Sequence, residues 1–298
     1  MHYVIGDVHG CYKELMALLG KIEEQDKDAR IIFVGDFMDR GPQVWDVLEW
    51  AMQNITPDGK YQSVRGNHEE MILDWYREWL KWWNAGGFAG CGAVMPDTYY
   101  DFVDWAENKG CLTQEKLEPI MEFFRSLPCQ KELRLNLGAG EIVYQIVHAW
   151  IPEREDMTEE ERKDCNLWLR RYGGNQVSED IIVHGHTPTV AIEYACNTSM
   201  APGMISYRHN AINVDGGCVF QDEYYRYPCM LCAICLETLE EIYPCTVDER
   251  FRQIYREGAK TVDEAMEAYR KQYLQKDNWY RWEMLERLEK LRKPNEEK

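Results

Sequence analysis

The chain has 298 residues, enough for a sizeable core, because a domain of this length buries about 75% of the surface of its unfolded chain. Its 52 Asp and Glu outnumber 34 Lys and Arg, giving a net charge of −18, and no run is rich in Lys or Arg. This charge argues against nucleic acid as a partner, because phosphate backbones are repelled. An anionic substrate must instead be held by local positive charge, such as a metal ion.

The start of the chain and its cysteines indicate a cytoplasmic protein with no membrane partner. Residues 1–7 run directly into a strand-like segment without the features of a signal peptide, and no segment has the length of a membrane span. Eleven cysteines, an odd number, suit a reducing compartment. Cys229, Cys232 and Cys235 have a spacing that zinc uses, but their apolar surroundings favour packing in a core.

The first 83 residues alternate between strand-like and helix-like segments. Strands are predicted at residues 3–6, 31–35 and 61–65, the second from the apolar, β-branched run Ile31-Ile32-Phe33-Val34. Helices are predicted over residues 12–22, from Pro42 onward, and over residues 69–83. This alternation predicts an α/β sheet whose loops gather at the carboxyl ends of the strands, where ligands bind in such sheets.

The middle of the chain, residues 75–129, is rich in Trp, Tyr and Phe and is predicted to be mostly helical. The simpler interpretation is a helical insertion that packs over the sheet. The alternative is a cap that shapes the substrate cleft, because insertions at a sheet edge often carry specificity. Further strands are predicted at residues 133–137, 141–147, 180–183, 211–214 and 231–236, the first two joined by the turn Gly138-Ala139-Gly140.

The last part of the chain, residues 246–298, is predicted to be a charged, helical extension of a main domain at residues 1–245. Its apolar residues are spaced for one buried face, so the extension is expected to pack on the domain. The residues of that face are Tyr273, Trp279, Trp282, Leu285 and Leu288.

Polar motifs follow five of the predicted strands. They are Gly6-Asp7-Val8-His9-Gly10, Gly35-Asp36-Phe37-Met38-Asp39-Arg40-Gly41, Gly66-Asn67-His68-Glu69, Val147-His148-Ala149 and Val183-His184-Gly185-His186-Thr187. Together they supply oxygen and nitrogen ligands without a thiolate, a set that suits manganese, iron or zinc in a catalytic site. The planar guanidinium of Arg40 matches the oxygens of a phosphoryl group. The sequence therefore predicts a metal site that handles phosphate.

The order of these motifs resembles that of the phosphoprotein phosphatase (PPP) family of calcineurin-like metallophosphoesterases, especially its bacterial and phage-type serine/threonine phosphatases. The resemblance covers about residues 1–240. It implies a metallophosphoesterase-like β-sandwich flanked by helices on both sides (α/β/β/α). The aromatic-rich insertion and the C-terminal extension would be additions to that fold.

The resemblance also implies two divalent ions, manganese first, with iron or zinc as alternatives. One ion would be held by Asp7, His9 and His186, the other by Asn67 and His148, and Asp36 would be shared by both. A hydroxide bridging the two ions would attack phosphorus in line, with no phosphoenzyme. Asn67 would contact the substrate as well.

The same resemblance gives roles to the remaining polar residues. Arg40 would bind the phosphoryl oxygens, and His68, paired with Asp39, would protonate the leaving alkoxide. The segment Leu167-Trp168-Leu169-Arg170-Arg171 resembles the family's Trp-x-Arg pattern and selects Arg170 as the second phosphate ligand. Arg171 is the competing choice, and a solvated helix face is the structural alternative. His184 is interpreted as a residue that supports the ligands or as a structural one, not as a ligand itself.

The leading hypothesis is hydrolysis of phosphoserine or phosphothreonine in proteins, because Asp39, Arg40 and Glu69 are all present. A small phosphoester is the other kind of substrate considered. The alternative enzyme is a dinucleoside polyphosphate (diadenosine tetraphosphate) hydrolase, because residues 6–12 also resemble that branch. In the symmetric tetraphosphatases the position of Asp39 is commonly not acidic, which favours the first hypothesis.

A non-catalytic scaffold is disfavoured, because a scaffold needs neither every ligand nor the acid pair. Two departures from the family pattern affect the expected substrate shape. Trp150 stands where glycine is frequent, and residues 213–217 replace an Asp-Thr-Gly pattern. Neither is expected to touch the metal ligands.

Overall fold

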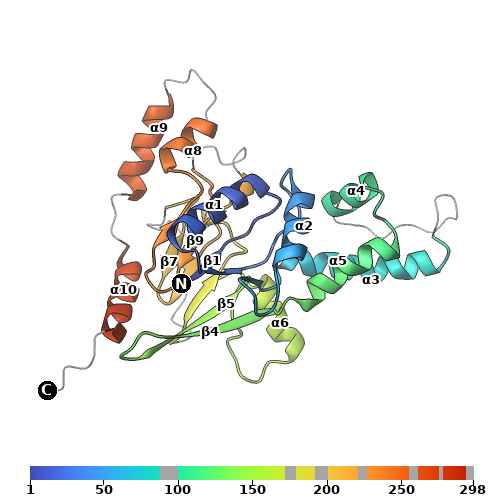
Figure 1. Cartoon of the computed structure of the whole chain (residues 1–298), viewed down its shortest axis with the longest axis horizontal. Coiled ribbons are helices and arrows are strands. Elements are labelled where there is room, and N and C mark those ends of the chain that lie inside the picture. The colour runs from blue at the N-terminus through green and yellow to red at the C-terminus, as the bar shows by residue number, and fades with distance from the viewer. Residues whose placement is uncertain are drawn as a thin grey trace.

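The computed structural model describes residues 1–87, 100–171, 179–191, 201–220, 227–254, 261–274 and 278–292. Two five-stranded sheets pack face to face, and helices flank them (Figure 1). The predicted β-sandwich flanked by helices is therefore confirmed.

The first sheet has the order β10-β9-β1-β2-β3. Its strands are β1 (His2–Ile5), β2 (Arg30–Phe33), β3 (Tyr61–Ser63), β9 (Ala233–Cys235) and β10 (Glu241–Ile242). The strands β1, β2 and β3 are parallel, whereas β9 runs antiparallel to both β1 and β10. The three parallel strands therefore end at the same edge, as their loop motifs predicted.

The second sheet has the order β4-β5-β6-β8-β7. Its strands are β4 (Gln130–Asn136), β5 (Glu141–Val147), β6 (Ile181–His184), β7 (Ser206–Arg208) and β8 (Ala211–Asn213). The hairpin of β4 and β5 has the predicted turn, although β4 begins three residues earlier than predicted. The strands β5, β6 and β8 are parallel, so this sheet also presents three carboxyl ends at one edge.

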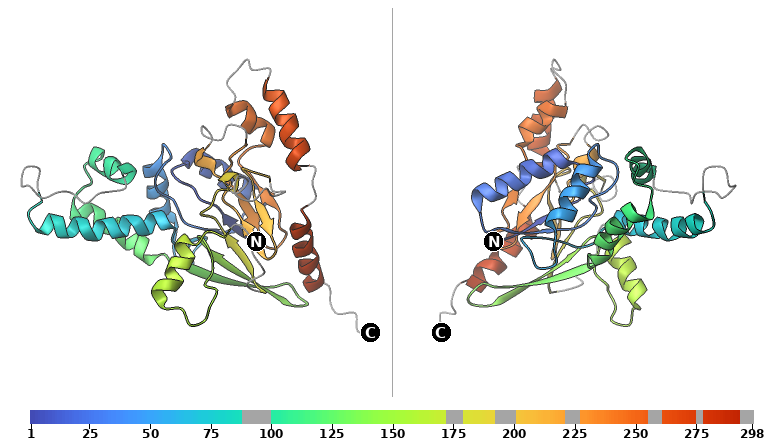
Figure 2. Two further views of the ribbon diagram at one scale, coloured as in Figure 1. Left: turned by 180° about the vertical axis from the view of Figure 1, so that it is seen from behind. Right: turned by 45° about the vertical axis from the view of Figure 1, so that its right-hand side comes forward.

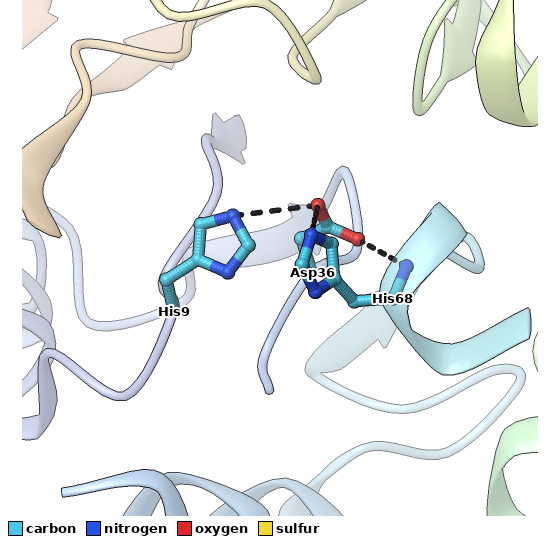
Figure 3. Close-up of side chains that lie close together, drawn as sticks. All are labelled: His9, Asp36 and His68. Carbon is cyan, nitrogen blue, oxygen red and sulfur yellow. Dashed lines mark hydrogen bonds and ion pairs between the residues drawn. The ribbon is translucent and has the colours of Figure 1, made fainter. Parts of the chain in front are cut away.

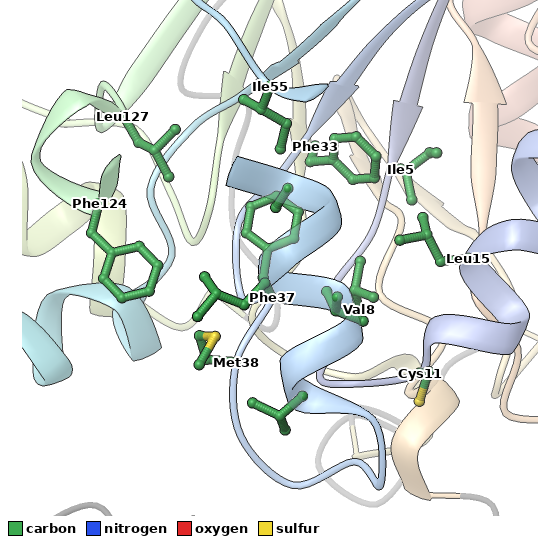
Figure 4. Packing of buried hydrophobic residues seen from close by; sticks show 14 of the residues in the cluster. Ile5, Val8, Cys11, Leu15, Phe33, Phe37, Met38, Ile55, Phe124 and Leu127 are labelled. Carbon is green, nitrogen blue, oxygen red and sulfur yellow. The ribbon is translucent and has the colours of Figure 1, made fainter. Parts of the chain in front are cut away.

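Alternation along the strands separates two apolar cores. In β1, Val4 faces the second sheet, whereas Ile5 faces the helices. Along β2, Ile32 likewise packs between the sheets and Phe33 packs outward. Figure 4 shows the outer core, where Phe33 and Ile5 meet Leu15 of α1. Because successive side chains of a strand point to opposite faces, such continuous apolar runs build both cores at once.

The outer face of the first sheet is covered by α1 (Tyr12–Gln25) and α2 (Val44–Asn54). The helix α1 buries its apolar residues at the predicted spacing of three and four: Leu15, Leu18, Leu19 and Ile22. This face packs on the strands that carry the first loop motifs. The two helices thereby fix the base on which those loops rest.

The aromatic segment forms an arm of three helices, α3 (Asn67–Asn84), α4 (Tyr100–Asn108) and α5 (Gln114–Ser126). It projects from the sheets on the side opposite the C-terminal helices (Figures 1 and 2). Stacked rings hold it together, such as Trp79 on Trp83 and Trp105 on Trp45 of α2. These contacts explain the aromatic composition by packing; a role in substrate specificity stays a prediction. Residues 88–99 of the predicted insertion lie outside the described residues.

The C-terminal part forms α8 (Val247–Ile254), α9 (Thr261–Tyr269), the π-helical turn η2 (Arg270–Leu274) and α10 (Trp279–Arg292). It is helical as predicted, and Tyr273 and Leu288 of the predicted face are buried, but the prediction is wrong for the two Trp residues. Trp279 and Trp282 are 74% and 58% exposed, while Met284 and Leu288 are buried against the second sheet. Met284 and Leu288 are four residues apart on one face, and the two Trp side chains lie on the other. The division at residue 245 stays a prediction.

The cysteine run lies in the core. Cys229, Cys232 and Cys235 are all buried, and β9 carries the last of them between β1 and β10. Burial raises the pKa of Cys229 to about 12, so its thiol stays neutral at physiological pH. The predicted core role is thus the one the structure supports. Within the described ranges, no helix is both long and apolar enough to cross a membrane.

Candidate metal centre

Six strands deliver a polar residue to one edge of the sandwich. Each of these residues follows the carboxyl end of a parallel strand: Asp7 after β1, Asp36 after β2, Asn67 after β3, His148 after β5, His186 after β6 and Asp215 after β8. All six are at most 6% exposed. The edge where the two sheets present their carboxyl ends is therefore a buried polar cluster.

Asp36 lies at the centre of this cluster. Its Oδ2 atom is 3.4 Å from His9 Nε2, 3.4 Å from His148 Nε2 and 3.9 Å from His68 Nε2. Its other oxygen, Oδ1, accepts a hydrogen bond of 3.0 Å from the backbone N–H of His68 (Figure 3). Two groups with ligand atoms close enough for one metal ion share this carboxylate: His9, Asp36 and His68, and Asp7, Asp36 and His148.

The ring of His186 lies with Asn67 and His148. Its Nδ1 atom is 2.9 Å from Asn67 Oδ1 and 3.1 Å from His148 Nε2. Only its backbone N–H reaches Asp7, at 3.0 Å from Oδ2. The sequence-based assignment placed His186 on the same ion as Asp7 and His9; the ring position instead supports a place on the other ion. The backbone of His186 is left-handed, with a φ of 66°.

Several residues of the cluster have left-handed backbone conformations. Positive φ angles occur at His9 (42°), Asp36 (53°), Asp39 (67°), Arg40 (68°) and His186 (66°). For residues other than glycine such conformations cost about 1–3 kcal/mol each and gather at functional sites. Close approach adds a need for glycine: a Cβ on Gly66 would lie 2.1 Å from Asp36 Oδ1, and one on Gly185 would lie 2.0 Å from Asp7 Oδ1. The folded chain therefore bears strain to aim these side chains.

Two histidines are oriented as metal ligands. The Nδ1 atom of His9 is 2.7 Å from the carbonyl oxygen of Met38, and that of His148 is 2.8 Å from the carbonyl oxygen of Val34. A carbonyl oxygen only accepts a hydrogen bond, so Nδ1 of each ring carries a proton and Nε2 faces Asp36. When the ring is neutral, the lone pair of Nε2 is available to a metal ion. Metal-binding histidines are commonly held by such a second hydrogen bond. The donor set therefore fits a divalent ion.

The pKa values of the cluster also favour binding of a cation. Burial raises the pKa of Asp7 well above its usual range, and the nearby charges of Asp215 and Asp36 raise it further. Burial opposes ionisation of Asp36 too, but His148 and His68 hold its pKa well below its usual range. Burial likewise lowers the pKa of His148, yet the charge of Asp36 outweighs this and raises it to about 9. The raised pKa of Asp7 means that the cluster resists a further negative charge, and a bound divalent cation would relieve that resistance.

His68 and Asp39 form a buried pair beside Asp36. The Nδ1 atom of His68 is 2.7 Å from Asp39 Oδ2, and both residues are at most 2% exposed. This bond fixes Nδ1 as the protonated nitrogen and turns Nε2 toward Asp36, 3.9 Å away. The geometry suits a proton donor held next to the metal ligands, the role that the sequence predicted.

Arg40 and Arg170 contact different residues of the cluster. Arg40 Nη1 donates to His9 Nε2 at 2.9 Å, and its guanidinium lies over the ring of Phe220. Arg170 Nη1 donates to the carbonyl oxygen of His186 at 3.3 Å and to Thr187 Oγ1 at 3.1 Å. Arg171 instead pairs with Glu153. This placement supports Arg170 rather than Arg171 as the second phosphate ligand.

Glu69 was noted in the sequence without a physical role, and the structure supplies one. Its carboxylate is fully buried and accepts hydrogen bonds from the backbone N–H groups of Asp36 (2.9 Å), Phe37 (2.8 Å) and Gly66 (2.8 Å). It therefore joins the loop after β2 to the start of α3. Glu69 holds the backbone that positions Asp36 and Asn67.

We expect Glu69→Ala to lower the free energy of unfolding by at least about 3 kcal/mol, because three buried N–H groups lose their acceptor at about 1–3 kcal/mol each. Urea unfolding followed by circular dichroism measures the change. Glu122→Ala, at an exposed position of α5, is the matched control and should shift the unfolding free energy by less than about 0.5 kcal/mol. Equal effects of the two substitutions would contradict the role of Glu69.

Asp215 was missed by the sequence analysis, which expected residues 213–217 to stay clear of the ligands. Asp215 is buried, its charge acts on Asp7, and burial raises its pKa to about 6. The sequence did hold a signal for Asp215, because Val214-Asp215-Gly216 follows a strand just as the other motifs do.

Trp150 packs its ring on His184, with ring centres 5.2 Å apart, and both are at most 9% exposed. His184 thus has a packing partner, as its structural interpretation predicted.

Comparison with known proteins gives a consistent assignment. The family model described as calcineurin-like phosphoesterase matches residues 3–206. The asymmetrical bis(5'-nucleosyl)-tetraphosphatase PrpE of Oceanobacillus iheyensis is 28% identical over 254 residues, which cover 76% of this chain and 88% of that protein. PrpE of Halalkalibacterium halodurans is 28% identical over 240 residues, covering 73% and 85%. A symmetrical bis(5'-nucleosyl)-tetraphosphatase of Coxiella burnetii is 41% identical over 157 residues, or 53% of this chain and 44% of that protein. This match includes the polar cluster from Asp7 to His186. The chain therefore belongs to the calcineurin-like phosphoesterase family.

Proposed function

We propose that this metallophosphoesterase cleaves dinucleoside polyphosphates, with phosphoserine and phosphothreonine in proteins as the second candidate substrates. The observation that carries the reaction is the buried cluster in which two groups of possible ligands share Asp36. The order of the two substrates is reversed relative to the sequence-based hypothesis. The reason is the similarity to asymmetrical tetraphosphatases over three quarters of the chain.

The residues that would hold the ions divide into two sets. His9 and Asp36 would hold one ion, with Asp7 as the family resemblance implies; Asp36, Asn67, His148 and His186 would hold the other. Asp7 also lies within reach of the second set, because its ligand atom groups with those of Asp36 and His148. When bound, such a pair of ions supplies Lewis acidity and makes hydroxide available near neutral pH. Manganese is the first choice, because carboxylate and amide oxygens suit it; the imidazole ligands keep iron and zinc as alternatives.

The chain's own side chains would bind the substrate and move one proton. Arg40 and Arg170 would hold the phosphoryl oxygens, since a guanidinium offers two parallel N–H groups to a phosphate. His68 would deliver a proton from Nε2 to the leaving oxygen while Asp39 stabilises the ring from Nδ1. Asn67, at the start of α3, would add a side-chain amide at the phosphate.

The second candidate, a phosphoserine or phosphothreonine protein, is favoured by the pair of His68 and Asp39. An alkoxide leaves poorly without a proton, so a positioned acid contributes most on an alkyl ester. The bond of 2.7 Å between the two residues is the specific observation in its favour.

The test uses the metal-stripped protein, to which Mn²⁺ is added back. Diadenosine tetraphosphate and a phosphoserine peptide are compared at equal concentrations, with nucleotides and phosphate quantified. Faster cleavage of the dinucleotide, together with unequal nucleotide products, supports the first proposal. Preference for the peptide moves the second candidate forward. Lack of hydrolysis of either substrate with Mn²⁺, Fe²⁺ or Zn²⁺ would overturn both.

We expect Arg170→Ala to lower kcat/KM by about 10- to 100-fold, because a charged hydrogen bond to phosphate contributes about 1.5–3 kcal/mol. The loss should appear mainly in KM if Arg170 binds ground state and transition state alike. Arg171→Ala is the matched control, since Arg171 pairs with Glu153, and it should change kcat/KM by less than about threefold. A larger loss in Arg171→Ala than in Arg170→Ala would show that the neighbouring arginine has this role.

A further inference from the structure

One exposed aromatic side chain, that of Trp168, lies beside the buried polar cluster. Among the described residues, five large apolar side chains are exposed: Met1, Trp168, Leu274, Trp279 and Trp282. Met1 starts the chain, and the last three belong to the C-terminal helices. Trp168 is 40% exposed and meets the ring of His186 edge to face, with ring centres 6.4 Å apart and planes at 88°. An exposed indole in this position presents a flat apolar surface next to the ligands.

Backbone hydrogen bonds connect the end of the helix that carries Trp168 to the segment after β5. Trp168 is the last residue of α6 (Glu159–Trp168). The end of this helix is tied to the segment after β5, because Ala149 N–H donates to Asn166 O at 2.7 Å and Trp150 N–H donates to Cys165 O at 3.2 Å. That segment directly follows His148. The backbone of Trp168 is thus placed relative to a proposed metal ligand, and the contact with His186 places its indole beside the cluster.

Trp168 and Arg170 both contact His186. The indole meets its ring with ring centres 6.4 Å apart, and Arg170 Nη1 donates to its carbonyl oxygen at 3.3 Å. Only Leu169 separates the two residues in the chain, so they lie at most about 7 Å apart between Cα atoms. An apolar ring and a phosphate-binding guanidinium therefore flank one place beside His186. A nucleotide presents this combination, a flat base and a phosphate separated by one ribose.

The charge of the protein makes such a contact useful. With a net charge of −18, the chain's overall field repels a polyphosphate. Stacking of an uncharged base on an aromatic ring adds affinity that this repulsion does not weaken. A phosphoserine side chain offers no flat group at the same distance from its phosphate.

We propose that Trp168 is the stacking platform for the base of a nucleoside phosphate whose phosphate binds at Arg170. This assignment rests on the proposed cleavage of dinucleoside polyphosphates and names the residue that selects the nucleoside. Trp168 acts on substrate affinity, and the proton transfer remains with His68.

The test compares two ligands that differ only by the base, adenosine 5'-monophosphate and ribose 5-phosphate. Calorimetric titration in the presence of Mn²⁺ gives a Kd for each. Wild type should bind the nucleotide at least about fivefold more tightly, since stacking of one base on an aromatic side chain supports a preference of that size. Trp168→Leu should remove this preference and leave the Kd for ribose 5-phosphate unchanged, whereas Trp168→Phe should keep most of it.

Trp279→Leu is the matched control, because Trp279 is 74% exposed on α10 and takes no part in the metal cluster. It should keep the wild-type preference. An unchanged preference in Trp168→Leu overturns the inference, as does a wild type that binds the two ligands equally while still cleaving phosphoesters. If wild type binds neither ligand and cleaves no phosphoester, the proposed function fails and the inference falls with it.

Discussion

Asp36→Asn is expected to lower kcat/KM for an aryl phosphate by at least about 10³-fold, at or beyond the upper end of what removal of one preorganised electrostatic group costs. Asp36 is shared by both groups of candidate ligands, and His9 Nε2 and His148 Nε2 each lie 3.4 Å from its Oδ2 atom. An amide in its place offers one neutral oxygen where the carboxylate offers two charged ones. If two ions share Asp36 as proposed, both would therefore lose a ligand through one substitution.

The fold should survive this change. Oδ1 of Asp36 accepts from His68 N–H, and the side-chain oxygen of Asn can accept the same bond. Replacing the carboxylate also removes one of the charges that raise the pKa of Asp7. We expect circular dichroism and thermal unfolding without metal to stay near wild type, so the loss of activity will not reflect unfolding.

Activity and bound metal are measured together as Mn²⁺ is added to the stripped proteins. Wild type should bind two ions per chain, and Asp36→Asn should bind at least one of them about 10- to 100-fold more weakly. Loss of a residue that only hydrogen-bonds to a metal ligand already lowers metal affinity by that factor. Asp74→Asn, at an exposed position of α3, is the control and should behave as wild type. Two tightly bound ions and normal turnover in Asp36→Asn would rule out a shared carboxylate.

Much of the site could be predicted because parallel strands end at one edge of a sheet. The polar residue after each predicted strand had to lie near the others, and the structure brings Asp7, Asp36, Asn67, His148 and His186 together. The direction of each ring was beyond the sequence. The ring of His186 lies beside Asn67 and His148, and nothing in Gly-His-Thr specifies the direction in which the ring points.

Errors in the predicted helices and strands have local causes. Trp279 and Trp282 are three residues apart, and so are Trp282 and Leu285, so helical spacing alone allowed a face that included them. The face that packs was decided by contact of Met284 and Leu288 with the second sheet. The short strands β7 and β10 were not predicted, because two or three residues carry too little periodicity to distinguish a strand from a loop.

His68→Ala is expected to lower turnover on an alkyl phosphate by about 10²–10⁴-fold, the usual contribution of a positioned proton donor. The bond of 2.7 Å to Asp39 keeps its Nδ1 protonated, so Nε2 is the atom that faces the leaving group. An aryl oxide or a nucleotide phosphate is a better leaving group than an alkoxide and needs less protonation. We therefore expect a smaller loss on those substrates.

Rates over a series of phosphate esters measure this effect, because removal of the donor should steepen the dependence of log kcat on the pKa of the leaving alcohol. Asp39→Asn should fall between wild type and His68→Ala, since the ring remains but its orientation is weakened. His209→Ala, at an exposed position that contacts Tyr280, is the control and should leave the slope unchanged. Equal losses of His68→Ala on alkyl and aryl esters would remove the proton-donor role. If the donor role holds, the loss on a phosphoserine peptide should exceed the loss on diadenosine tetraphosphate, because only the peptide releases an alkoxide.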